Sequence, residues 1–181
     1  MFMRTRRLFL RPIFPEDWPS VFSGVASKEI VRNLARAPWP YGESDARNFC
    51  AAAPHPGSYR FAITLPEEAG APLIGCIGLD AAGDDGLEIG YWIAQGWQGR
   101  GFATEAASGV VALADAIGFG PLVGGHFLDN PASGRVLRKI GFVPTGEHLP
   151  CASAGRGGAS QPTVRYRRAA GAGHGSHPAA A

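Results

Sequence analysis

The sequence has few of the features that mark secreted, membrane-spanning or metal-dependent proteins. Its 181 residues include only three cysteines, and their uneven spacing fits neither a disulfide framework nor a metal site. No apolar run approaches the roughly 18 residues that a membrane helix needs, and the basic residues 1–7 lack the apolar stretch of a signal peptide. We therefore expect a cytoplasmic protein that uses no metal and does not contact a membrane.

An excess of one charge is also absent. The chain has 17 Lys and Arg against 15 Asp and Glu, and a net charge of +2 is too small to predict nucleic-acid binding. With 45% hydrophobic residues, the chain is long enough for one well-filled core. We predict a single domain over residues 1–168, and a disordered tail over residues 169–181, where Ala, Gly and His leave almost nothing to bury.

A glycine-rich turn between a strand and a helix is the most informative segment. Residues 87–93 alternate in polarity, which predicts a strand with Glu88 on the face opposite the apolar side chains. Apolar residues at helical spacing then predict a helix from Ala103 that ends near Gly118. The connection, residues 97–102, reads Trp-Gln-Gly-Arg-Gly-Phe. Such a helix start offers unpaired N–H groups and a positive dipole end to a phosphate, although glycine turns also serve as plain connectors.

The remaining segments predict a mixed α/β protein. The order of elements implies a mixed sheet with helices on both faces. We expect further strands at residues 8–12, 59–65, 72–79, 122–127, 142–149 and 163–167, and further helices at residues 15–26, 43–53 and 134–140, the last of these closed by Gly141.

At this point the chain resembles the GNAT superfamily of acyl-CoA N-acyltransferases. Gln98-Gly-Arg-Gly-Phe-Ala103 matches its acetyl-CoA pyrophosphate loop, and Asn130, Ser133 and Lys139-Ile-Gly-Phe142 match its last core motif. Residues 5–12, 16–17, 38–41 and 73–79 are similar to the RimJ/RimL-like branch of ribosomal-protein N-acetyltransferases. The resemblance implies a GNAT-type, mostly antiparallel sheet of about seven strands. It also implies that strands 87–93 and 122–127 diverge and leave a slot for the pantetheine arm.

The resemblance further implies which residues hold acetyl-CoA as co-substrate. The amides from Gln98 to Ala103 would hold the pyrophosphate, Arg100 would add charge, and Asn130 would bind the pantetheine or its surroundings. Arg135 and Arg138 suit the nucleotide 3′-phosphate, unless they are solvated surface residues. The full predicted set is Ile93, Gln98, Gly99, Arg100, Gly101, Phe102, Ala103, Thr104, Asn130, Ser133, Arg135 and Arg138.

Acyl transfer to an amine needs a base, because an α-amine with a pKa of about 8 or a lysine with one of about 10.4 must lose a proton before attack. Glu88 is the candidate base, and the alternative is a solvated or ion-paired strand residue. Backbone N–H groups of the diverging strand would stabilise the charge that develops on the thioester oxygen. No covalent enzyme intermediate is required, so Cys76, inside an apolar strand, is interpreted as a packing residue.

The leaving thiolate needs a proton donor. The family's usual tyrosine is replaced here by Leu137, and the Rim-type branch implies Ser133 instead, although a simple hydroxyl at a helix N-terminus would look the same. His126 would serve as acid or base if it faced the slot, or it is structural. Glu105, in the first turn of the cofactor helix, is explained by the helix dipole alone.

The acceptor is less well defined by the sequence. Residues 36–41 and the loop 148–161 are predicted to wall its site. Within the first segment, Trp39 and Tyr41 either stack on a substrate or form a packed connector. No acidic cluster is present to favour a polyamine. We expect a protein N-terminal amine or a small-molecule amine as acceptor, and a monomer or homodimer.

Two other functions are weighed against the N-acetyltransferase. The missing tyrosine suggests a non-enzymatic CoA-binding or interaction protein of the same fold. A nucleotide- or dinucleotide-binding protein is disfavoured, because the glycine run lacks the third glycine of a dinucleotide fingerprint and no Gly-Lys-Ser/Thr sequence is present.

Overall fold

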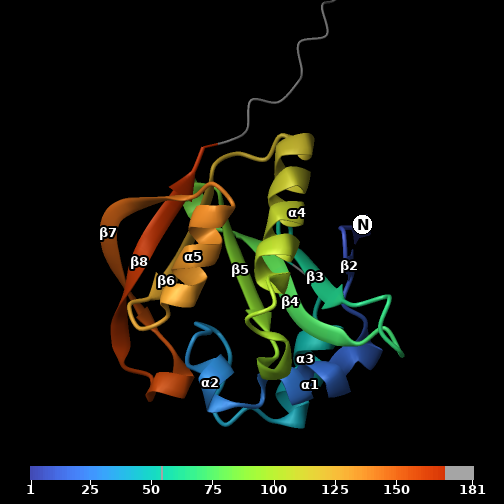
Figure 1. Ribbon diagram of the computed structural model, residues 1–181. Helices are drawn as coiled ribbons and strands as arrows, with labels where there is room; N and C mark the ends of the chain where they lie inside the picture. Colours follow the sequence, from blue (N-terminus) through green and yellow to red (C-terminus); the bar gives the residue numbers. More distant parts are fainter. Residues whose placement is uncertain (54, 170–181) are drawn as a thin grey trace, which may run out of the picture.

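The computed structural model describes residues 1–53 and 55–169, so the predicted tail, apart from Ala169, lies outside the described residues. Eight strands form one sheet in the order β1-β2-β3-β4-β5-β6-β8-β7 (Figure 1). The strands are β1 (Met3–Arg4), β2 (Phe9–Arg11), β3 (Tyr59–Thr64), β4 (Leu73–Ala81), β5 (Leu87–Ile93), β6 (Leu122–Phe127), β7 (Val143–Ala152) and β8 (Ser160–Arg168). The α-helices are α1 (Trp18–Val25), α2 (Lys28–Val31), α3 (Glu43–Ala51), α4 (Phe102–Ile117) and α5 (Pro131–Lys139).

The sheet opens between its two central strands. All neighbouring strands pair antiparallel except β5 and β6, which run parallel. These two strands share only the register pairs Leu87↔Leu122 and Glu88↔Val123. Beyond Glu88 they separate, which confirms the expected divergence. The sheet has one strand more than the seven expected, because the two-residue β1 adds to its edge.

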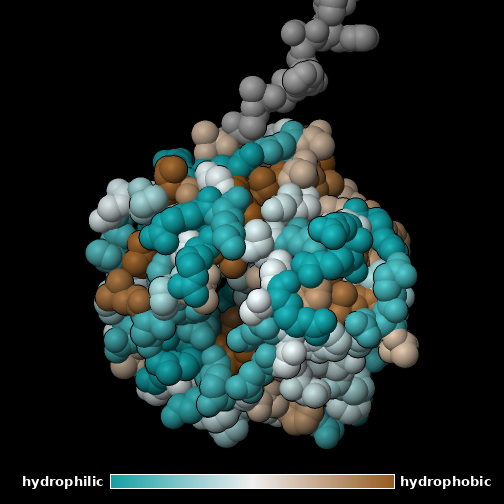
Figure 2. Space-filling model, in the orientation of Figure 1, coloured by the Kyte–Doolittle hydropathy of each residue, from teal (hydrophilic) through white to brown (hydrophobic). Residues whose placement is uncertain are grey.

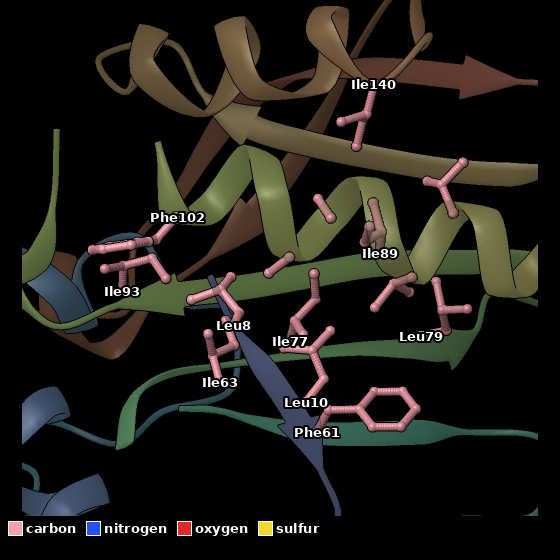
Figure 3. Close-up of a cluster of buried hydrophobic side chains, with 14 of the residues drawn as sticks. Leu8, Leu10, Phe61, Ile63, Ile77, Leu79, Ile89, Ile93, Phe102 and Ile140 are labelled. Carbon is pink, nitrogen blue, oxygen red and sulfur yellow. The ribbon is translucent and has the colours of Figure 1, made fainter. Parts of the chain in front are cut away.

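Two hydrophobic clusters lie on opposite faces of the sheet. Cys76 and Ile77 are neighbours on β4 but belong to different clusters, as the alternation of side chains along a strand requires. The larger cluster joins the sheet to α4 and includes Ile77, Ile89 and Phe102 (Figure 3). The smaller one gathers residues of α1 and α3 against β4. Helices therefore cover both faces, as predicted.

Local signals explain the ends of the two helices that flank the opening. Gly101 precedes α4 with φ 83°, and Gly118 ends it with φ 77°, both in the left-handed region that favours glycine. α5 begins three residues earlier than predicted because Asn130 caps it, the Asn130 Oδ1 accepting from the Ser133 amide. It ends in a Schellman motif at Gly141, with the Phe142 amide donating to the Leu137 carbonyl. Among the described residues, no helix is long and apolar enough to cross a membrane.

Candidate active site

The start of α4 lies beside the opening of the sheet. Gly99 and Gly101 take left-handed φ values of 74° and 83°, and the first intrahelical bond runs from the Glu105 amide to the Gly101 carbonyl. The amides of Phe102, Ala103 and Thr104 precede that bond, so they have no acceptor inside the helix. Figure 2 shows a hollow with an apolar floor between the polar surfaces of α5 and of the loop before α4. The helix start is therefore suited to an anion.

The predicted loop residues hold one another in place. The Gln98 Nε2 donates to the Ile93 carbonyl at 2.8 Å, which ties the loop to the end of β5. The guanidinium of Arg100 lies 4.9 Å from the Trp97 ring centroid and 5.1 Å from that of Phe102. Phe102 itself is 3% exposed and packs in the larger cluster. Its backbone, rather than its ring, is thus the part that a ligand would meet.

A contact that sequence reasoning missed fixes the same helix start. The Glu105 carboxylate accepts hydrogen bonds from the Thr5 hydroxyl at 2.7 Å and from the Arg7 amide and Nε at 2.6 and 2.7 Å. Arg7 also donates to the Arg100 carbonyl at 3.2 Å. Burial raises the pKa of Glu105, but the bonds from Thr5 and Arg7 outweigh it and hold that pKa below its ordinary value. The helix dipole alone is thus an incomplete account of Glu105.

Tyr91, which had no predicted role, meets Ser133 on the α5 side of the opening. The two hydroxyls are 2.8 Å apart, and the Tyr91 hydroxyl also lies 3.3 Å from the Ser133 carbonyl. Burial raises the pKa of Tyr91 to about 12, although the hydrogen bond to Ser133 works against this shift. Leu137, at the position of the usual family tyrosine, is 1% exposed and belongs to the core. A tyrosine is therefore present at the opening, but it comes from β5.

Glu88 is the last residue of β5 that pairs with β6, and it therefore marks the apex of the opening. Its Oε1 lies 2.5 Å from an Arg165 Nη1, and no described residue binds its Oε2. The Glu88 side chain is 43% exposed, against 16% for Arg165. Two residues along the same face, a Cβ built on Gly90 would meet no atom within 4 Å. The carboxylate is thus ion-paired, yet it stands beside open surface.

His126 on β6 and the two α5 arginines are three further residues with predicted roles. The His126 Nδ1 is 2.8 Å from the Phe127 carbonyl, and its Nε2 is 3.5 Å from the Tyr166 hydroxyl. These contacts agree with the structural alternative for His126. Arg135 and Arg138 are exposed, and the Arg138 guanidinium lies 5.5 Å from the Tyr166 ring centroid. Their contact with a phosphate stays a prediction.

The predicted acceptor aromatics differ in burial. Trp39 is 39% exposed, whereas Tyr41 is 9% exposed and packs in the smaller cluster. Tyr41 therefore has the surroundings of a packed connector, and only Trp39 has a surface for stacking. Cys76 packs in the same cluster, and burial raises the pKa of its thiol well above the ordinary value. Within the described residues, no group of three or more His, Cys, Asp or Glu could hold a metal ion.

The fold and this site define a class of proteins, the GNAT acetyltransferases. A GNAT acetyltransferase of known structure from Bacillus anthracis superposes with a TM-score of 0.80 at 23% identity, covering 93% of this chain and 98% of its own. RimL, a ribosomal L7/L12 α-N-protein acetyltransferase solved with coenzyme A, superposes with a TM-score of 0.75 at 18% identity and the same coverages. Vibrio cholerae spermidine N-acetyltransferase, solved with CoA and spermine, gives 0.74 at 19% identity, with coverages of 91% and 96%.

Sequence comparison then identifies the family. Residues 7–143 match the acetyltransferase (GNAT) domain. YoaA, an uncharacterised N-acetyltransferase of Bacillus subtilis (strain 168), is 31% identical over 150 residues, which cover 80% of this chain and 84% of YoaA. YnaD of the same organism is 25% identical over 157 residues, which cover 86% and 90% of the two chains. The chain belongs to the GNAT acetyltransferase family.

Proposed function

We propose that this protein is a cytoplasmic N-acetyltransferase of the RimJ/RimL-like kind, which moves an acetyl group from acetyl-CoA to a primary amine. The acceptor is a protein N-terminal amine or a small-molecule amine. The observation that carries the proposal is the start of α4, where two left-handed glycines and three amides without intrahelical acceptors follow the end of β5, beyond the point where β5 and β6 separate. RimL and the spermidine enzyme, which share the fold, were both solved with CoA.

The residues present fit this co-substrate. Amides from Gln98 to Ala103 would bind the pyrophosphate, with Arg100 supplying charge and the pair Arg7 and Glu105 fixing the helix start. The diverging strands leave room for the pantetheine arm beside β5, near Asn130. Bound acetyl-CoA supplies an activated thioester, and the chain supplies the rest of the chemistry. A metal ion is not part of this proposal.

Glu88 is the base in this proposal. It lies at the apex of the opening, and the open surface at Gly90 gives an amine room to approach it. The ammonium loses one proton to the carboxylate, directly or through water, and the free amine attacks the carbonyl carbon. The nitrogen releases its second proton to solvent as the carbon–sulfur bond breaks and the amide forms. Arg165 orients the carboxylate through its Oε1. The reaction is thus one direct attack in a ternary complex.

Ser133 is the proton donor to the leaving thiolate, and Tyr91 positions it. Tyr91 is protonated at neutral pH, so its hydroxyl can donate to the Ser133 Oγ, which leaves the Ser133 proton available for the sulfur. Solvent then restores the proton to Ser133. This pair supports catalysis over the non-enzymatic alternative, whose main argument was the missing tyrosine at Leu137.

Acetyl-CoA binding tests the proposed co-substrate. At about 100 times its dissociation constant, acetyl-CoA should raise the melting temperature by roughly 5–10 °C, whereas NAD and ATP should not. Equal shifts in melting temperature from all three ligands would contradict acetyl-CoA as the co-substrate. Gly99→Ala and Gly70→Ala form a matched pair, since both glycines have positive φ and open space around them. Only Gly99→Ala should weaken acetyl-CoA binding in a calorimetric titration.

A further inference from the structure

A cavity of about 550 Å³ lies between α2 and the short helix η4 (Ala154–Arg156). Its volume falls in the range of small-molecule sites. Three cations, Lys28, Arg32 and Arg156, line it together with Glu29, Gln161 and the glycines next to Arg156. None of these residues belongs to the set that would hold acetyl-CoA, so the cavity offers a second site.

Arg156 forms the fixed wall of this cavity. Its Nε donates to the Arg32 carbonyl at 2.6 Å, and its two terminal nitrogens reach the Asp129 oxygens at 3.0 and 2.6 Å. The guanidinium also lies 4.1 Å from the Phe127 ring centroid, and the side chain is only 12% exposed. The backbone beside it packs closely against the end of α2, because a Cβ built on Gly155 would lie 2.5 Å from the Arg32 amide nitrogen. The wall is therefore preformed.

Arg32 and Lys28 have side-chain hydrogen-bond donors that no described residue uses. They lie four residues apart, about one helical turn, and both are exposed. Arg32 gives one terminal nitrogen to Asp129 at 2.5 Å, and its other donors have no partner among the described residues. The Lys28 ammonium lines the cavity and forms no hydrogen bond or ion pair with any described side chain or carbonyl. Three cations face two carboxylates, Glu29 and Asp129, which leaves a surplus of positive charge.

The cavity adjoins the reaction centre proposed above. Gln161, on its lining, is the register partner of Cys151 on β7. Gln161 also lies four residues before Arg165 on β8, on the same face of the strand, and Arg165 binds Glu88. Asp129, which joins both arginines, directly precedes Asn130 at the start of α5. Figure 1 shows α2 beside the turn that links β7 and β8, below α5.

We propose that this cavity is an anion subsite for the acceptor, and that the acceptor is a small primary amine that also carries a carboxylate or a phosphate. Its amine reaches Glu88 while its anionic group binds Arg32 and Lys28. This inference rests on the proposed acetyl transfer. The positive surplus disfavours a polyamine, since a second ammonium would enter a site that already holds excess positive charge.

Matched acceptor pairs test the subsite. Glycylglycine against glycylglycinamide isolates the carboxylate, and phosphoethanolamine against ethanolamine isolates the phosphate. The anionic member of at least one pair should be acetylated with a kcat/KM about tenfold higher or more, and the responding pair identifies the anion. Arg32→Gln and Lys28→Gln should each reduce that preference. Arg4→Gln, which removes an exposed, ion-paired arginine near Glu67, should leave it unchanged.

The failure of this inference can be distinguished from that of the proposed function. Acetylation with no preference for the anionic members, or with spermidine preferred, overturns the subsite and leaves acetyl transfer intact. If no amine is acetylated, the subsite is tested by an NMR titration that follows the amide resonances of Gly155 and Gly157. They should shift with phosphoethanolamine or glycylglycine and not with ethanolamine or glycylglycinamide, which lack the anionic group, and the absence of such shifts overturns the subsite. Loss of acetyl-CoA binding would contradict the proposed function instead.

Discussion

Two pairs of side chains at the opening define the proposed chemistry at the scale of single residues. Glu88 with Arg165 lies at the apex, and Tyr91 with Ser133 lies on the α5 side. The roles of Glu88 and Ser133 follow from strand alternation and family resemblance. Their partners, however, are 77 and 42 residues away in sequence, so no local pattern reveals them. In the proposed mechanism, Arg165 would orient Glu88 and Tyr91 would position Ser133.

Glu88→Gln tests the base. The amide keeps the shape of the side chain but cannot take up a proton, so kcat should fall about 100-fold or more while the acetyl-CoA dissociation constant stays within about twofold. Asp80→Asn is the matched control, because Asp80 is the β4 register partner of Glu88. An unchanged rate in Glu88→Gln, or an equal loss in both variants, would remove Glu88 from the mechanism.

Tyr91→Phe and Ser133→Ala, alone and combined, test the proton donor. If Tyr91 acts through Ser133, each single variant should lower kcat roughly tenfold, and the double variant should be no slower than Ser133→Ala. KM for acetyl-CoA should change little. Tyr59→Phe serves as a control, since Tyr59 packs on the same cluster and has no hydrogen-bonded hydroxyl among the described contacts. Additive losses in the double variant would show that Tyr91 acts independently of Ser133 and would contradict its positioning role.

At the scale of elements, the sequence is most informative where the signal is local. Helical periodicity and the glycines locate α4, and Gly141 correctly predicts the end of α5. α2 and β1 could not be predicted in this way, because four and two residues are too short to show a period. The Arg7–Glu105 contact, which spans 98 residues, depends on how the chain start packs on α4. The cavity at α2 is hidden from the sequence for the same reasons.

Glu105→Gln tests the contact that fixes the start of α4. Removing the charge should raise the acetyl-CoA dissociation constant and lower the free energy of unfolding by about 1–2 kcal/mol. The folded pKa lies below the ordinary value of 4.5, so this stabilisation is present above pH 4.5 and is lost as pH falls through the folded pKa. Urea unfolding should therefore show the wild type and the variant converging in acid. A constant difference across pH would contradict this account.

At the scale of the whole molecule, the chain has the GNAT architecture: one eight-stranded sheet with helices on both faces. In the proposed function, the helix start would bind the phosphates, the separation of β5 and β6 would admit the pantetheine arm, and the surface near Glu88 and the α2 cavity would receive the acceptor. Composition predicted a core of this size, and motif spacing predicted the family. The proposed acceptor subsite depends on packing between α2 and η4, which no motif encodes.

The release of CoA thiol in the presence of a panel of primary amines tests the central claim most directly. The account predicts release that depends on both protein and amine, with one acetylated amine formed for each CoA and with loss of the rate in Glu88→Gln. Peptides with free N-termini and the anionic small amines belong in the panel. Binding of acetyl-CoA without release for any amine would contradict the claim and favour the non-enzymatic alternative.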